Sequence, residues 1–180
     1  MYKYCITEES ALRQRQLEQC LQELMLTTEY SQITISDISD RAGISRKSFY
    51  RYFSSKEGCL HALIDHAVFD GASFYLPNHN DDRSSKVSYQ RFFLYWKEQH
   101  LLLDALLRNS MISMLYEQML DYVTKEDQDY RIFFRDHTGD AHERTMFYIG
   151  GIMTMVLDWH QNGYHHSVSQ MAQILSELIL

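Results

Sequence analysis

The sequence has few of the residues that break helices or build tight turns. It contains one proline and seven glycines among 180 residues. Strands joined by hairpins need such residues at their turns, so a sheet-based fold is disfavoured. The composition is otherwise ordinary for a globular protein, with 45% hydrophobic and 23% charged residues. We therefore predict an all-α fold.

Several kinds of functional motif are also missing. The three cysteines form no CxxC pair, and the nine histidines form no HExxH or zinc-binding spacing. The sequence has no GxSxG nucleophile motif and no glycine-rich loop that would cradle a phosphate. We therefore predict no catalytic residue, no metal site and no cofactor. An odd number of unpaired thiols is typical of a reducing compartment, the cytoplasm.

Long apolar runs are absent as well. No stretch approaches the roughly 18 apolar residues that a membrane-spanning helix needs. The first ten residues also lack the apolar core of a secretory leader. The expectation is a cytoplasmic protein that makes no use of a membrane.

Acidic charge is present but unevenly distributed. The formal net charge is −7, and residues 1–60 hold eight bases and eight acids. Residues 61–180 hold nine bases and sixteen acids. No acid interrupts the five bases between Arg41 and Lys56. Since an acidic body repels nucleic acid, only the N-terminal third is suited to contact a polyanion.

Apolar periodicity and capping residues divide the chain into about nine helices. The clearest interruption is the turn-rich stretch at 76–86, which contains the proline. The helices are expected at about 8–28, 35–42, 46–52, 54–74, 83–99, 101–109, 111–130, 140–162 and 168–179.

Two short helices near residue 40 are marked by strong local signals. Thr34 and Asp37 form a capping box at the start of the first helix, and Gly43 suits the left-handed residue that ends it. Ser45 is a good N-cap for the second helix, and Ser54 is expected to cap the helix that follows. Two helices joined in this way form a helix-turn-helix, whose second helix enters the major groove in DNA-binding proteins.

The second of these helices carries side chains that are suited to DNA. Arginine donates two hydrogen bonds to guanine, whereas lysine and hydroxyl groups reach phosphates. Helix N-termini add backbone N–H groups for phosphate. The alternative is an ordinary solvated, charged helix face. The candidate DNA-binding residues are Thr34, Arg46, Lys47, Ser48, Tyr50, Arg51, Tyr52 and Lys56.

The stretch from Ile33 to about Leu63 resembles the DNA-binding domain of the TetR family of transcriptional regulators. By this resemblance Tyr50 and Lys56 contact phosphates. Relatives often have glycine at the position of Lys47, so this chain carries an additional base there. The matching residues are Thr34, Arg41-Ala42-Gly43-Ile44-Ser45, Phe49-Tyr50-Arg51-Tyr52-Phe53, and Lys56-Glu57 with Leu60.

Residues 147–164 and the helix after them resemble the end of the C-terminal domain in many TetR-like regulators of Gram-positive bacteria. The resemblance implies that these two helices pack on their copies in a homodimer. A glycine inside a helix costs about 1 kcal/mol relative to alanine, so the Gly150-Gly151 pair needs a reason such as this close approach. The alternative is an apolar stripe that packs only within its own subunit. The expected interface residues are Phe147, Gly150, Gly151, Thr154, Met171, Leu175 and Leu178.

The resemblance further implies a helix-turn-helix DNA-binding domain at 1–55 and a helical effector-binding and dimerisation domain at 56–180. Aromatic residues and methionines in the second domain are suited to line an apolar pocket for a small molecule. The alternative is that they form plain core. The pocket candidates are Phe92, Tyr95, Trp96, Tyr116, Met119, Met153 and Trp159.

The leading hypothesis is a dimeric regulator that reads a pseudo-palindromic, double-stranded operator. It is expected to be a repressor that an unknown small-molecule effector releases. A second hypothesis is a TetR-like co-activator that works mainly through protein–protein contact. A third, a helical metal-dependent enzyme, requires stoichiometric metal in the purified protein.

Overall fold

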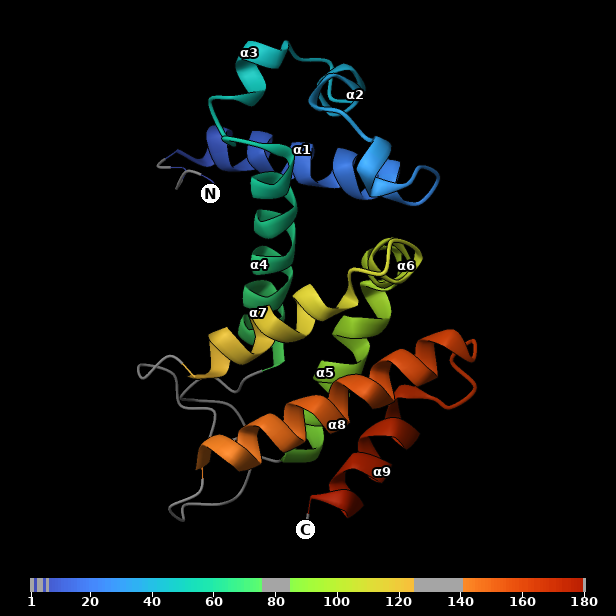
Figure 1. Cartoon of the computed structure of the whole chain (residues 1–180). Coiled ribbons are helices and arrows are strands. Elements are labelled where there is room, and N and C mark those ends of the chain that lie inside the picture. The colour runs from blue at the N-terminus through green and yellow to red at the C-terminus, as the bar shows by residue number, and fades with distance from the viewer. Residues whose placement is uncertain (1, 3–4, 6, 76–84, 125–140, 180) are drawn as a thin grey trace. The chain divides into compact units, whose positions relative to one another are not determined.

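The computed structural model describes residues 2, 5, 7–75, 85–124 and 141–179. Within these ranges the chain forms nine α-helices, one short 3-10 helix and no strand, which confirms the all-α prediction (Figure 1). None of these helices is both long enough and apolar enough to cross a bilayer. The elements are α1 (Glu8–Met25), η1 (Tyr30–Gln32), α2 (Ile35–Arg41), α3 (Arg46–Phe49), α4 (Lys56–Tyr75), α5 (Ser85–Glu98), α6 (His100–Arg108), α7 (Ile112–Thr124), α8 (Ala141–Gln161) and α9 (Val168–Leu178).

The chain divides into two compact units. Unit 1 comprises residues 1–67 and 101–112, and unit 2 comprises residues 68–100 and 113–180. Most of α6 therefore packs with the N-terminal helices, although the sequence places it in the middle of the C-terminal part. The expected boundary after residue 55 separates DNA binding from effector binding and dimerisation, and it stays a prediction. The compact units divide the chain at other positions.

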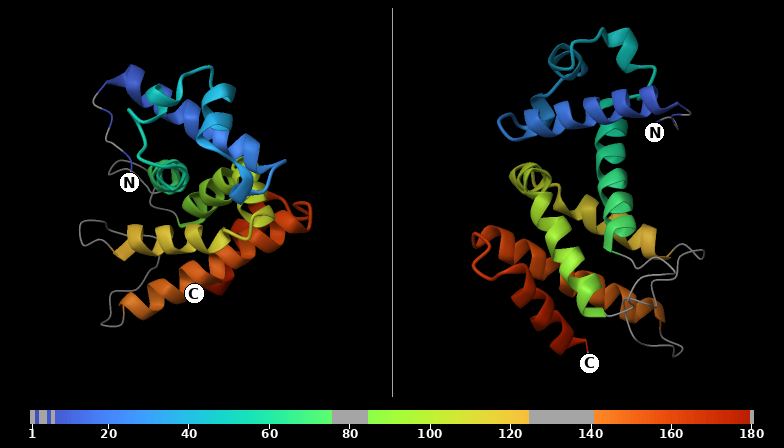
Figure 2. Two further views of the ribbon diagram at one scale, coloured as in Figure 1. Left: turned by 45° about the horizontal axis from the view of Figure 1, so that its top comes forward. Right: turned by 180° about the vertical axis from the view of Figure 1, so that it is seen from behind.

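Unit 1 is built around the apolar face of α1. Leu17 and Leu21 on this face are fully buried, as is Ile38 of α2. Figure 1 and the right-hand view of Figure 2 show α2 and α3 on the same side of α1. Phe49 and Phe53 lie four residues apart, are fully buried, and bring their ring centroids to 5.4 Å. Burying these rings leaves the remaining residues of α3 to face solvent.

The predicted caps of the helix-turn-helix are present, with one correction further along the chain. Thr34 and Asp37 form a complete capping box. Gly43 has a φ of +66° and ends α2 as expected. Ser54, however, is not the cap of α4. The backbone N–H of Gly58 donates to Ser55 Oγ at 3.1 Å, because α4 begins at Lys56 and the residue directly before it is the one in position to cap.

Unit 2 has a core of aromatic side chains between α5, α8 and α9. Trp96 of α5 and Trp159 of α8 are at most 1% exposed. The ring of Phe93 meets Trp159 edge-on at 5.7 Å and 87°. At the surface, Lys86 of α5 donates to Gln173 of α9 at 2.9 Å. These contacts join α5 to α8 and to α9.

Candidate nucleic-acid interface

The helix α3 is short and tightly capped. Ser45 Oγ accepts a hydrogen bond from the N–H of Ser48 at 3.2 Å, and the two hydroxyls lie 3.0 Å apart. The α-helix ends at Phe49 rather than at the expected Tyr52. The next residues continue as tight turns in which Tyr52 N–H donates to Phe49 O at 2.9 Å. This winding keeps residues 50–52 next to α3 while Phe53 returns to the core.

Three bases on and directly after α3 point into solvent. Arg46, Lys47 and Arg51 are exposed, and Tyr50 is 44% exposed beside them. Among the residues that the structure describes, no carboxylate or carbonyl pairs with any of these three bases. Their hydrogen-bonding capacity is therefore available to a partner outside the unit. Ser48 and Tyr52 are only partly exposed and border the same surface.

The other two bases of the 41–56 stretch are used inside unit 1. Arg41 forms an ion pair with Glu23 of α1, with Nη2 at 2.7 Å and Nε at 2.8 Å from Oε2. Lys56 Nζ donates to Tyr30 O at 2.6 Å and to Ile33 O at 2.7 Å. It also lies 4.2 Å from the centroid of the Tyr30 ring. An ammonium group has three donors, so these contacts leave one for a phosphate.

The phenol beneath Lys56 is held in its neutral form. Burial raises the pKa of Tyr30, with smaller contributions from Glu57 and Cys59. A neutral ring under the ammonium makes a cation–π contact and adds no opposite charge. The Tyr30 ring and the two carbonyls therefore hold the Lys56 ammonium group on η1 together. The phosphate contact of Lys56 stays a prediction. In the structure Lys56 also binds the carbonyls of Tyr30 and Ile33 within unit 1.

At the start of α2, Thr34 already has a partner. Its hydroxyl donates to Asp37 Oδ2 at 2.7 Å, and its backbone N–H donates to the same oxygen at 2.8 Å. These two hydrogen bonds lower the pKa of Asp37. The carboxylate therefore stays ionised at the positive end of the α2 dipole. A DNA phosphate at this helix end would lie close to that negative charge, and the predicted DNA contact of Thr34 stays a prediction.

The predicted pocket residues fall mostly in the core of unit 2. The Trp159 indole N–H donates to His166 O at 2.9 Å. The Trp96 indole N–H is buried and has no hydrogen-bond partner in the part of the chain that the structure describes. Tyr116 is partly exposed, with its hydroxyl 3.2 Å from Thr154 Oγ1. The exposed fractions of the others are 3% for Phe92, 8% for Tyr95, 0% for Trp96, 5% for Met119, 0% for Met153 and 1% for Trp159.

The predicted dimer residues divide into two sets. Met171 and Leu175 are 4% and 1% exposed, because they pack inside unit 2 and offer almost no surface to a second copy. For these two residues the alternative of packing within the subunit describes the structure. The other set reaches solvent, with Phe147 at 77% and Leu178 at 66%. Gly151 and Thr154 are exposed, and Gly150 is partly exposed.

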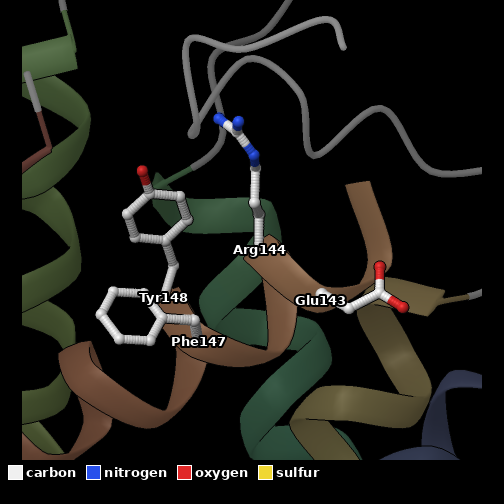
Figure 3. A pocket seen from close by; sticks show the side chains of 4 residues that line it. All are labelled: Glu143, Arg144, Phe147 and Tyr148. Atoms are coloured by element: carbon white, nitrogen blue, oxygen red, sulfur yellow. The ribbon is translucent and has the colours of Figure 1, made fainter. Parts of the chain in front are cut away.

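An open hollow of about 490 Å³ lies beside the first turns of α8 (Figure 3). Its lining includes Glu143, Arg144, Phe147 and Tyr148. Arg144 and Tyr148 point to the same side of the helix, and Glu143 points elsewhere. None of these residues is among the pocket candidates from the sequence. In the described ranges no three His, Cys, Asp or Glu side chains are placed to hold a metal ion together.

Comparison with known proteins agrees with this geometry. Residues 23–63 match the family model "Bacterial regulatory proteins, tetR family", and residues 88–180 match "Transcriptional regulator C-terminal region". The chain is 40% identical over 62 residues to the HTH-type transcriptional regulator EthR of Mycolicibacterium smegmatis. It is 29% identical over 72 residues to the dhaKLM operon transcriptional activator DhaS of Lactococcus lactis. These matches cover 31% and 38% of this chain, and 29% and 38% of the two relatives.

Solved structures extend the similarity to almost the whole chain. A TetR-like regulator from Rhodococcus sp. RHA1 has a TM-score of 0.65 at 16% identity, with 94% of each chain covered. The dihydroxyacetone kinase operon activator DhaS has a TM-score of 0.58 at 20% identity, again with 94% of each chain covered. At these identities the likeness shows the fold alone. With both family models matched along the sequence, the chain belongs to the TetR family of transcriptional regulators, which bind DNA and are not enzymes.

Proposed function

We propose that this regulator acts as a homodimer that binds a pseudo-palindromic operator through α3 and represses transcription until a small molecule releases it. The observation that carries the proposal is the exposed set of Arg46 and Lys47 on the capped α3 and Arg51 in the turns that follow it. Unpaired bases on a helix of this kind are suited to guanine edges and to phosphates. The acidic remainder of the chain favours contact with DNA through this surface alone.

Homodimerisation is supported by the solvent-facing side of α8. Phe147, Gly151 and Thr154 lie four and three residues apart, which places them on one face of the helix. A Cβ added to Gly150 or Gly151 would meet no atom within 4 Å. Packing within the subunit therefore does not require glycine here, whereas close approach of a second helix would. A two-fold dimer would set two α3 helices about 34–36 Å apart, one turn of DNA.

Release by a small molecule is supported by the indole of Trp96. Buried N–H donors in proteins are nearly always hydrogen-bonded, and each exception calls for an explanation. The donor of Trp96 lies in an aromatic core that includes Phe92 and Tyr95. A small molecule carrying an acceptor group would satisfy this donor. Such an effector releases DNA only if it binds the DNA-free state more tightly than the DNA-bound state.

The test is a titration of the purified protein with fluorescent duplexes. One duplex carries the DNA upstream of the protein's own gene, and the other is random DNA of equal length. We expect preferential binding to the first, a stoichiometry of two chains per duplex, and weaker binding of Arg46→Ala and Lys47→Ala. Equal affinity for both duplexes, with the two variants unchanged, would refute sequence-specific binding and favour the co-activator hypothesis.

The sign of regulation needs a separate measurement, because one relative, DhaS, is described as an activator. A reporter gene placed behind the bound DNA is compared in cells with and without the regulator. We expect lower reporter output when the regulator is present. Higher output would contradict repression and leave the DNA-binding proposal intact.

A further inference from the structure

The last turn of α6 ends in an unusual way. Met111 N–H donates to Leu106 O at 2.8 Å, and Ser110 N–H donates to Leu107 O at 3.1 Å. This pair of bonds is a Schellman turn, and its left-handed residue is usually glycine. Here Ser110 occupies that position with a φ of +56°. The residue before it, Asn109, is thus held at the helix end by a backbone conformation that a non-glycine residue adopts only at a cost.

The end of α8 provides an internal comparison. It makes the same turn, with Tyr164 N–H donating to Trp159 O at 2.8 Å and Gly163 at a φ of +69°. Asn162 precedes that glycine, as Asn109 precedes Ser110. Asn162 Nδ2 donates to the carbonyl four residues back at 2.9 Å, as Asn109 Nδ2 does at 2.7 Å. The two asparagines therefore share their local role.

Asn109 differs because it also reaches a distant part of unit 1. Its Oδ1 accepts from the N–H of Tyr30 at 2.6 Å, and its Nδ2 donates to Met25 O at 3.0 Å. These partners are 79 and 84 residues away in sequence. Met25 ends α1 and Tyr30 opens η1, so both groups belong to helix ends that lack intrahelical partners. One side chain therefore fixes the corner between α1 and η1.

The contacts continue from this corner to the DNA-binding helices. Lys56, which opens α4, binds the carbonyls of Tyr30 and Ile33. Thr34 follows directly and caps α2, which leads through Gly43 into α3; this path of the chain can be followed in Figure 1. The carbonyl side of η1 is thus held by Lys56 and its N–H side by Asn109.

We propose that Asn109 is a positioning residue that couples unit 2 to the helix-turn-helix through η1; this rests on the proposed function. Along the chain α6 is connected to α5 and to α7, both of which belong almost entirely to unit 2, and α4 is the helix that itself crosses from unit 1 into unit 2. A change in unit 2 that displaces the end of α6 acts on the α1–η1 corner through Asn109. Sequence reasoning missed this residue because no motif marks a side chain whose partners are so distant.

Coupling of this kind is reciprocal, so DNA can serve as the probe. If the state of α6 alters DNA binding, then DNA binding must alter α6. Hydrogen exchange is measured on the wild type, Asn109→Ala, Asn109→Asp and the matched control Asn162→Ala. Each protein is measured alone and with the duplex from the titration above. Asn109→Asp keeps an acceptor for the Tyr30 N–H and removes the donor to Met25 O.

Without DNA, we expect the Tyr30 amide of Asn109→Ala to exchange about tenfold faster than in the wild type. Asn109→Asp should be intermediate, and Asn162→Ala should match the wild type. With DNA, the wild type and Asn162→Ala should change exchange at both 46–52 and 101–124. Asn109→Ala should keep the change at 46–52 and lose it at 101–124.

Persistence of the DNA-induced change at 101–124 in Asn109→Ala would overturn the coupling role. So would a wild type protected by DNA at 46–52 with no change at 101–124. No protection at 46–52 in the wild type would overturn the proposed function instead, and the coupling to DNA with it. Even then, the Tyr30 amide without DNA would show whether Asn109 holds the corner, which separates the two failures.

Discussion

The five bases between Arg41 and Lys56 form two groups that the structure uses differently. Arg46, Lys47 and Arg51 are exposed and unpaired within the described residues. Arg41 and Lys56, at the two ends of the stretch, bind Glu23 of α1 and the carbonyls of Tyr30 and Ile33. The end bases hold the helix-turn-helix onto the rest of unit 1, and the central bases are left for a partner.

This division shows that a basic stretch is not a uniform DNA-binding surface. If the proposed function holds, substituting a central base should remove a contact to DNA and leave the folded protein nearly unchanged. Substituting an end base removes hydrogen bonds to backbone carbonyls or an ion pair with a carboxylate inside unit 1, and this acts on stability first. The two groups are therefore distinguished by measuring DNA affinity and unfolding free energy on the same variants.

The largest effect is expected for the triple variant Arg46→Ala, Lys47→Ala, Arg51→Ala. Each lost base or phosphate contact costs about 1–3 kcal/mol, so affinity for the specific duplex should fall by about 100-fold or more. The slope of log K against log salt should flatten by about 0.9 for each phosphate contact removed. Fluorescence anisotropy at several salt concentrations measures both quantities.

The control for this variant is its stability. Surface substitutions that touch no buried group change the unfolding free energy by about 0.5 kcal/mol or less. Urea unfolding of the triple variant should therefore overlay that of the wild type. A large loss of stability would mean that the central bases also support the fold, and the division into two groups would be lost.

The second effect concerns Lys56→Met, which keeps most of the side-chain length and removes the ammonium group. Hydrogen bonds to a charged group contribute about 1.5–3 kcal/mol, so the unfolding free energy should fall by about that amount. Urea unfolding measures it, with Lys47→Met as the matched control that should not change. Lower DNA affinity at unchanged stability would instead assign Lys56 mainly to phosphate binding.

A smaller effect is expected for Arg41→Ala. The Arg41–Glu23 pair has side chains that are 46% and 35% exposed, and exposed pairs contribute about 0.2–1 kcal/mol. Adding Glu23→Ala measures the coupling between the two side chains in a double-mutant cycle. A coupling free energy near zero, with DNA affinity reduced in Arg41→Ala alone, would move Arg41 into the DNA-binding group.

The smallest effect concerns pH and the acid at the start of α2. The pKa of Asp37 is lowered by its hydrogen bonds with Thr34. A lowered pKa contributes stability above the unfolded value of about 3.9, and this stability is lost as the pH falls through the folded value. Asp37→Asn should flatten the fall in stability below about pH 4, as measured by thermal unfolding from pH 2 to 6. If Asp37→Asn loses stability below about pH 4 as steeply as the wild type, the ionised Asp37 carboxylate does not contribute to the stability of the capping box.

Much of the helix-turn-helix is predictable because its signals are local. The caps at Thr34 and Ser45 act on N–H groups three residues away. Gly43 supplies a φ that other residues adopt with difficulty. The positive charge of the stretch from Arg41 to Lys56 follows directly from its amino-acid composition. The extent of α3 was less predictable, because the turns after Phe49 resemble a helix in their apolar spacing.

What the sequence alone determined is the family, the all-α class and the position of the helix-turn-helix. The helix-turn-helix depends on residues within a few positions of one another, and the all-α class follows from the scarcity of proline and glycine. Only the tertiary structure decided which bases stay free, because the partners of Lys56 lie 26 and 23 residues away. It also decided that Met171 and Leu175 face the core of their own unit, and that α6 joins the N-terminal helices. Asn109 is the extreme case. The turn that ends α6 beside it involves only neighbouring residues, but its contacts with Met25 and Tyr30 exist only once unit 1 has folded.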